Sequence, residues 1–141
     1  MNYNFHTNTK KILSDLHTPV STYLKVRDAF PQSALLESSD FHANENVTSY
    51  IGLEPIASVD VNRGLCTMKL PDGNKEIRPL SASFTISDAL SSFLRKINVK
   101  GEQSDACGLF GYTTFNCVKY TENIPVRESR DERSDAPDML Y

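Results

Sequence analysis

The chain has 141 residues, of which 39% are hydrophobic and 23% charged, and its formal net charge is −3. This length suits one domain with one core. A slightly acidic chain gives no indication of a nucleic-acid partner. No apolar run is long enough to cross a membrane, and the beginning of the chain lacks the apolar core of a signal peptide. The odd number of cysteines, three, argues against a disulfide framework and indicates reduced thiols in a cytoplasmic protein.

The first thirty residues predict an extended segment followed by a helix. Residues 1–9 are polar and predict a strand or an ordered arm. Thr18 and Pro19 predict the beginning of a helix, because threonine can cap the helix and proline suits its first position. Pro31 ends this helix, since the residue before a proline is disfavoured in helical geometry. A short helical turn with Ile12, Leu13 and Leu16 is predicted between the extended segment and this helix.

A polar loop separates two strand-like runs between Ala34 and Gly52. The first run, Ala34–Ser38, changes from apolar to polar along its length, and the second is Thr48–Ile51. Side chains alternate across a strand, so Leu36 and Ser38 share one face and Glu37 lies on the other.

The middle of the chain predicts more strands. Pro55–Val61 is one candidate, and Leu65–Leu70 and Lys75–Leu80 flank an Asp-Gly pair. Asp-Gly between two alternating runs is a strong hairpin pattern. Its buried face would carry Cys66, Met68 and Leu70.

A helix is predicted over Thr85–Ile97, where apolar residues recur at helical spacing. Thr85 and Asp88 approximate a capping box at its beginning. Gly108–Tyr112 predicts a buried strand whose glycines permit close approach of another backbone segment. A short helix with Phe115 and Val118 follows.

The composition changes near the end of the chain. Nine of the seventeen residues in Glu122–Asp138 are charged, which predicts a solvated loop or linker. The apolar residues after it predict the opening of a further element, so the chain is expected to be a fragment of a longer protein. The predicted organisation is a domain over residues 1–121, with residues 122–141 as linker and start of the remainder. Strands without regular strand–helix alternation predict the α+β class, with a mostly antiparallel sheet and a few packed helices.

A candidate ligand site follows from the polar pair Glu37 and Ser38. A carboxylate attracts an amino group, and a hydroxyl with nearby backbone N–H groups can receive a carboxylate, so the pair suits a zwitterion. Ser49 on the next strand would add a second hydroxyl. The alternative is that both serines only bond neighbouring backbone at strand ends.

Other chemistry-bearing residues give weaker patterns. His6, His17 and His42 have no paired spacing for a metal ion. Cys117 has no histidine or other base near it in the sequence, which argues against a nucleophile. The acidic residues from Asp131 to Asp138 alternate with arginines and predict a solvated segment.

Four segments in order carry a resemblance to a known family. LLESSD and, after a loop, SYIG resemble the amino-terminal part of anthranilate synthase component I. TPVSTYLKVRDAFPQSALLESSD and GLFGYTTFNCVKYTE fit the same family, so the resemblance runs from about His17 to the last residue. Many members have Gly-Arg-Tyr where this chain has Asn46-Val47-Thr48, which removes a basic contact from this loop.

The resemblance implies a regulatory part of a larger chorismate-utilising enzyme. It assigns a feedback site for tryptophan to Glu37, Ser38, Ser49 and Tyr50. The full enzyme would convert chorismate and ammonia to anthranilate and pyruvate with Mg²⁺, and a glutamine amidotransferase, component II, would supply the ammonia. The catalytic and metal-binding residues of the family lie in its carboxyl-terminal chorismate-binding domain. This chain would therefore hold no cofactor and no catalytic residue, and would be inactive alone.

Three alternatives remain open at this stage. The same layout occurs in aminodeoxychorismate synthase component I and in isochorismate synthase. The third alternative is a free-standing module that binds an amino acid.

Overall fold

The computed structural model describes residues 2–37, 48–122, 124 and 136–141. The chain divides into two compact units: Lys10–Pro55, here called the hairpin unit, and Met1–Thr9 with Ile56–Tyr141, called the sheet unit. Helices combine with mostly antiparallel strands, which confirms the predicted α+β class. The predicted boundary between residues 121 and 122 stays a prediction.

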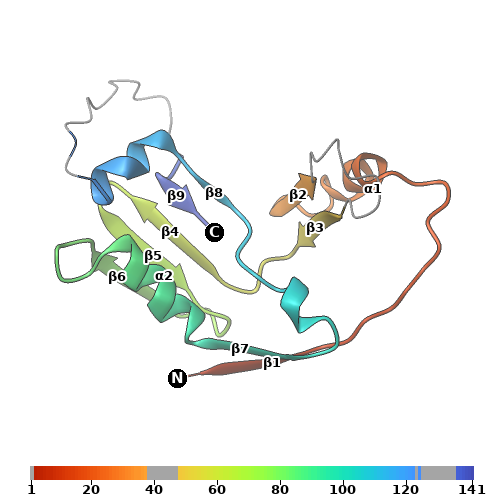
Figure 1. Cartoon of the computed structure of the whole chain (residues 1–141), viewed down its shortest axis with the longest axis horizontal. Helices are drawn as coiled ribbons and strands as arrows, with labels where there is room; N and C mark the ends of the chain where they lie inside the picture. Colours follow the sequence, from red (N-terminus) through yellow and green to blue (C-terminus); the bar gives the residue numbers. More distant parts are fainter. Residues whose placement is uncertain (1, 38–47, 123, 125–135) are drawn as a thin grey trace. The chain divides into compact units, whose positions relative to one another are not determined.

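The sheet unit is built on an antiparallel sheet with the strand order β6-β5-β4-β9-β8 (Figure 1). The strands are β4 (Ser58–Asn62), β5 (Leu65–Lys69), β6 (Lys75–Pro79), β8 (Tyr112–Thr113) and β9 (Met139–Leu140). Met139 and Leu140, in the apolar run after the charged segment, form β9, which lies inside the sheet between β4 and β8. The buried strand predicted over Gly108–Tyr112 is wrong, because only Tyr112 of that run is in β8 and its side chain is 41% exposed.

Alternation along the strands places one face of this sheet in the core. Val59 lies opposite Met68, and Val61 lies opposite both Cys66 and Met139. All five side chains are at most 3% exposed. Burial of Cys66, Met68 and Leu70 confirms the predicted buried face of the hairpin.

Each of the two tight turns of this sheet has a glycine with a positive φ. Between β4 and β5, Arg63 and Gly64 have φ values of 50° and 78°, as in the turns that match strand twist in hairpins. Between β5 and β6, Gly73 has a φ of 85°, and the Asp72 side chain accepts a hydrogen bond from the backbone N–H of Asn74. These turns hold β4, β5 and β6 in register.

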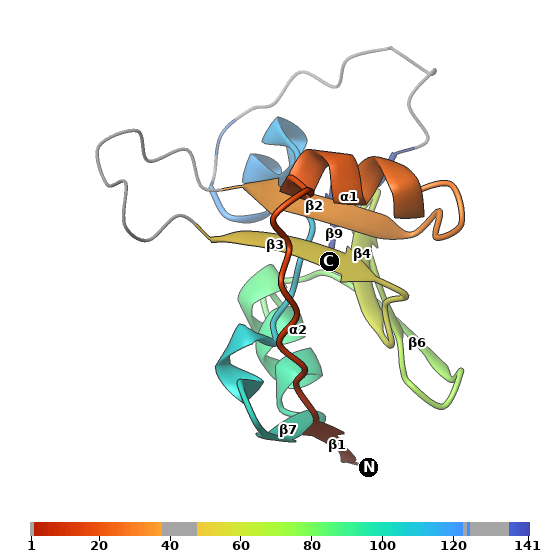
Figure 2. The same ribbon diagram turned by 90° about the vertical axis from the view of Figure 1, so that its right-hand side faces the viewer.

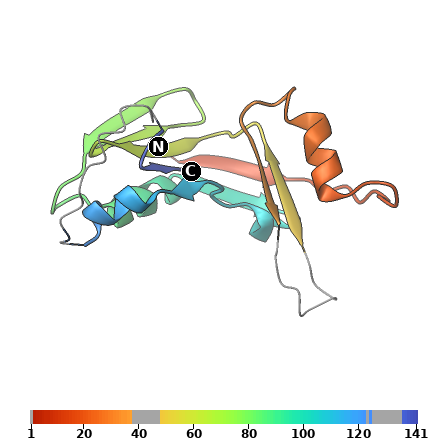
Figure 3. The same ribbon diagram turned by 90° about the horizontal axis from the view of Figure 1, so that it is seen from above.

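Helix α2 (Ile86–Leu94) covers the core face of the sheet. Thr85 and Asp88 form the predicted capping box. Ile86, Ala89 and Phe93 are buried, and Figure 3 shows α2 on the same side of the sheet as the 3₁₀ helix η2 (Phe115–Tyr120). The helix is shorter than predicted, because Ile97 belongs to the next strand.

That strand, β7 (Ile97–Gly101), pairs in parallel with β1 (Tyr3–Thr7), which confirms the predicted strand in residues 1–9. The 3₁₀ helix η1 (Ser104–Ala106) follows β7. At the edge strand β6, Arg78 lies 3.9 Å from the ring centroid of Phe84. The Arg78 side chain thus lies over a buried ring of the core at the sheet edge.

The hairpin unit consists of α1 (Pro19–Val26), β2 (Ser33–Glu37) and β3 (Ser49–Leu53). Thr18 caps α1 as predicted, and α1 contacts both strands (Figure 2). The helical turn predicted at Ile12, Leu13 and Leu16 is wrong: these side chains are 76–92% exposed, and residues 10–17 form no helix. A stripe of apolar residues without a packing surface does not stabilise a short helix.

Candidate functional site

The hairpin unit brings two of the predicted site residues together. Glu37 ends β2, Ser49 begins β3, and the two are register partners in the antiparallel pair. Residues directly opposite each other in such a pair have Cβ atoms about 4.5–5.5 Å apart. A carboxylate and a hydroxyl therefore lie side by side at this end of the hairpin, with Glu37 exposed and Ser49 half-buried.

Tyr50 lies on the opposite face of the hairpin. Its register partner is Leu36, and both side chains are about two-fifths exposed, at 43% and 39%. Alternation places Tyr50 on one face and the Glu37–Ser49 pair on the other. Ser38 lies outside the described residues, as do His42 and the first two residues of Asn46-Val47-Thr48.

The two faces of the hairpin have different surroundings. Leu35 and Ile51 share a face with Glu37 and Ser49, and both are half-buried. On the other face, an added Cβ at Gly52 would meet no atom of the described chain within 4 Å. Leu35 and Ile51 are thus the apolar side chains on the same face as the carboxylate and the hydroxyl.

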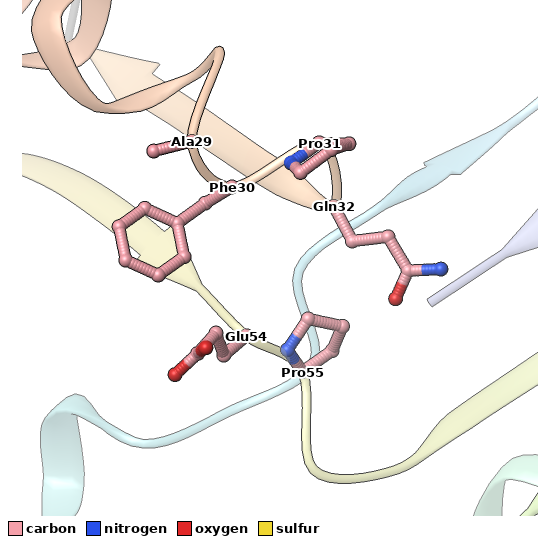
Figure 4. Close-up of a pocket in the computed structure, with 6 residues that line it drawn as sticks. All are labelled: Ala29, Phe30, Pro31, Gln32, Glu54 and Pro55. Atoms are coloured by element: carbon pink, nitrogen blue, oxygen red, sulfur yellow. The ribbon is translucent and has the colours of Figure 1, made fainter.

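An open hollow of about 510 Å³ lies at the other end of the same hairpin. It is lined by Ala29, Phe30, Pro31, Gln32, Glu54 and Pro55 (Figure 4). Figure 4 shows the Phe30 and Glu54 side chains on one side of the hollow and the Gln32 side chain on the other. Glu54 has a φ of 50°, an unusual value for a non-glycine residue. The predicted site residues that the structure describes do not line this hollow.

A second hollow in the sheet unit is lined mainly by polar side chains. The Tyr3 hydroxyl donates a hydrogen bond of 2.7 Å to Asp72, and Lys96 pairs with Glu76. The hydrogen bond to Asp72 raises the pKa of Tyr3 to about 12. The Tyr3–Asp72 hydrogen bond links β1 to the turn of the β5–β6 hairpin, and the Lys96–Glu76 pair links the residues after α2 to β6.

A partly buried polar cluster of the sheet unit, around Tyr120 and Asp138, was not predicted. The Tyr120 hydroxyl accepts a hydrogen bond of 2.7 Å from the backbone N–H of Gly64 and donates one of 2.7 Å to the Asp138 carboxylate. Lys119 lies 3.4 Å from the same carboxylate, whose side chain is only 14% exposed. Burial, followed by the nearby Asp138, raises the pKa of the Tyr120 hydroxyl. The prediction that Asp138 belongs to a solvated segment is therefore wrong. The other acidic residues of that prediction, Asp131, Glu132 and Asp135, lie outside the described residues.

Tyr120→Phe is expected to lower the free energy of unfolding by about 1–3 kcal/mol, because Gly64 N–H and Asp138 would both lose a partner. Urea denaturation measures the change. Tyr112→Phe is the matched control, since Tyr112 is 41% exposed, and its effect should stay within about 0.5 kcal/mol. Equal midpoints for the two variants would contradict the prediction.

The remaining titratable groups do not form a metal centre in the described part of the chain. No group of three or more His, Cys, Asp or Glu side chains could hold a metal ion there, so these residues do not fit a Mg²⁺ site. Cys66 and Cys117 are buried, and burial raises the pKa of both thiols. His6 and His17 are exposed.

Across the described residues, no helix is long and apolar enough to span a membrane.

The sequence is similar to two curated proteins. It is 28% identical over 130 residues to anthranilate synthase component 1 of Synechocystis sp., across 92% of this chain and 25% of that protein. It is 28% identical over 137 residues to anthranilate synthase component 1 of Thermus thermophilus, across 94% of this chain and 27% of that protein. The chain thus spans about a quarter of the length of these relatives, and no protein-family model matches it. The two matches confirm the resemblance found in the sequence.

Proposed function

We propose that the chain is the amino-terminal regulatory and structural part of an enzyme of the anthranilate synthase component I type, and that its hairpin unit contributes to a feedback site for tryptophan. The observation that carries the proposal is the pairing of Glu37 with Ser49 at one end of the hairpin. Similarity to two proteins named anthranilate synthase component 1 supports it.

The chemistry of this pair suits the polar half of an amino acid. The Glu37 carboxylate would attract the α-ammonium group of tryptophan, and the Ser49 hydroxyl would donate to its carboxylate. Ser38, directly after Glu37 in the sequence, would add a second hydroxyl. Leu35 and Ile51 offer apolar surface on the same face. Tyr50 is on the opposite face, so its role would be to fix β3 rather than to touch the same ligand atoms.

The rest of the activity is assigned to sequence that this chain does not contain. The parent enzyme would convert chorismate and ammonia to anthranilate and pyruvate in the cytoplasm. Its carboxyl-terminal chorismate-binding domain would hold Mg²⁺ and the catalytic groups, and a glutamine amidotransferase component II would supply ammonia. Tryptophan would inhibit by binding the inactive state more tightly than the active one.

Ser38→Ala and Glu37→Gln test the proposal in the full-length enzyme that contains this chain. Each removes one polar contact, and a hydrogen bond is worth about 0.5–1.5 kcal/mol, or more when a charged group takes part. The half-inhibiting tryptophan concentration should rise severalfold to tenfold, and Ser38→Phe should raise it further by filling the site. The uninhibited rate should not change.

Ser33→Ala is the matched control, because Ser33 lies at the other end of β2, opposite Leu53. It should leave both the rate and the inhibition unchanged. If the Glu37 and Ser38 variants are inhibited like the wild type, the hairpin is not part of a tryptophan site. If the uninhibited rate collapses instead, regulation and chemistry are not separated as proposed.

A further inference from the structure

The hollow at the end of the hairpin away from Glu37 and Ser49 combines one negative charge with apolar surface. Glu54 carries the only charged side chain among its six lining residues, and the others include Phe30 and two prolines. All six belong to the hairpin unit. The volume, about 510 Å³, lies within the range of about 300–1,000 Å³ that is typical of ligand sites. The hollow is therefore large enough to receive a long side chain.

The polar groups of this hollow have no partners in the described part of the chain. Neither the Glu54 carboxylate nor the Gln32 amide forms a hydrogen bond or an ion pair with a described residue. Both residues are exposed. By contrast, the Asp28 carboxylate, close by in the sequence, pairs with Arg27. The Glu54 carboxylate and the Gln32 amide are thus available to a ligand.

The backbone of Glu54 is in a conformation that this residue disfavours. Its φ is 50°, which is uncommon for a residue with a side chain. Pro55 follows, and the residue before a proline prefers extended geometry with negative φ. A glycine would adopt this φ with less strain. Residues held in such conformations are concentrated at sites that bind ligands, which supports a role for the carboxylate beyond the fold.

The chemistry of the lining suits the side chain of arginine. A guanidinium group donates two parallel hydrogen bonds to a carboxylate and also stacks on an aromatic ring. Figure 4 shows the Phe30 and Glu54 side chains on the same side of the hollow, where one planar cation can meet both. The apolar stem of arginine would lie against Pro31 and Pro55. On the other side, the Gln32 amide offers a donor and an acceptor, as a peptide group requires.

We propose that this hollow binds the guanidinium group of an arginine side chain carried by a partner polypeptide. Sites for small molecules surround most of their ligand, whereas this hollow is open and suits one side chain presented by a larger molecule. The proposal does not rest on the tryptophan site, because none of the lining residues belongs to the Glu37–Ser49 pair.

Titration of the wild-type chain with three blocked amino acids, followed by ligand-observed NMR, tests the proposal. N-acetylarginine amide is the probe. N-acetylcitrulline amide has nearly the same shape without the charge, and N-acetyllysine amide has the charge without the planar group. The arginine probe should bind about threefold to tenfold more tightly than either, because an exposed ion pair or one charged hydrogen bond contributes that much.

Two variants and a matched control locate the binding. Glu54→Gln keeps the size of the side chain and should remove the preference for arginine over citrulline. Phe30→Leu keeps apolar bulk without a ring and should reduce the preference for arginine over lysine. Glu122→Gln changes the net charge by the same amount at an exposed residue of the sheet unit, and it should leave all three affinities unchanged. Urea denaturation shows whether each variant is folded.

The comparison of probes on the wild-type chain decides without any variant. The proposal is overturned if the citrulline or the lysine probe binds as tightly as the arginine probe. It is also overturned if Glu54→Gln binds the arginine probe like the wild type, or if Glu122→Gln weakens the binding equally, since binding would then follow net charge. Free arginine carries its own carboxylate and should bind more weakly than the blocked probe. Tighter binding of free arginine would overturn the assignment to a polypeptide.

Discussion

Gly111→Val is expected to lower the free energy of unfolding by about 3 kcal/mol or more, as for the severe steric class of substitutions. An added Cβ at this position would lie 1.9 Å from the carbonyl oxygen of Leu140 and 2.8 Å from the Cα of Tyr141. Both are backbone atoms, so no side-chain rotation relieves the overlap. The strand β9 is held from its other side by β4, and it can move away only by giving up those hydrogen bonds.

Gly108→Val provides the comparison for Gly111→Val. An added Cβ at Gly108 would meet no atom of the described chain within 4 Å, and the change should alter the unfolding free energy by less than about 1 kcal/mol. Urea denaturation followed by circular dichroism measures both variants. Equal losses in the two variants would mean that the close approach at Gly111 is not what requires a glycine there.

Local patterns were sufficient to predict much of the sheet unit. The Asp-Gly pair predicted the β5–β6 hairpin, and alternation predicted the burial of Cys66 and Met68. Thr85 and Asp88 predicted the beginning of α2, because capping uses residues three positions apart. In each case the information lies within a few residues of the feature.

The features that were missed depend on contacts between distant segments. Two residues of β9 carry no strand pattern of their own, and only pairing with β4 and β8 makes them a strand. The environment of Asp138 is set by Tyr120 on η2, so its charged neighbours in the sequence gave the wrong prediction. The end of α2 at Leu94 is another such case, since Ile97 pairs with Tyr3 at the beginning of the chain.

The candidate site was predictable only in part, because alternation is a local pattern and the register between two strands is not. Alternation alone separates Ser49 from Tyr50, which are consecutive on β3. The pairing of Ser49 with Glu37 depends on the register of β2 against β3, and no short turn pattern in the sequence between them specifies it. The structure is therefore needed to place the carboxylate and the hydroxyl opposite each other.

Phe93→Ala is expected to lower the free energy of unfolding by about 3–5 kcal/mol, the range for a buried phenylalanine. Phe93 is 0% exposed and is among the largest fully buried side chains. It projects from α2 into the cluster that Val59, Met68 and Met139 form on the sheet. Its removal would leave a cavity next to three strands, β4, β5 and β9.

Leu94→Ala is the control on the same helix. Leu94 is 50% exposed, and alanine is the better helix former, so this change should cost less than about 1 kcal/mol. Thermal and urea denaturation of both variants gives the comparison, and exposure of Met139 to oxidation reports whether β9 leaves the sheet. If the two variants lose the same stability, the core does not depend on Phe93 as its burial indicates. If Phe93→Ala is destabilised while Met139 stays protected, the cavity is local and β9 is held by its backbone hydrogen bonds and by Asp138 instead.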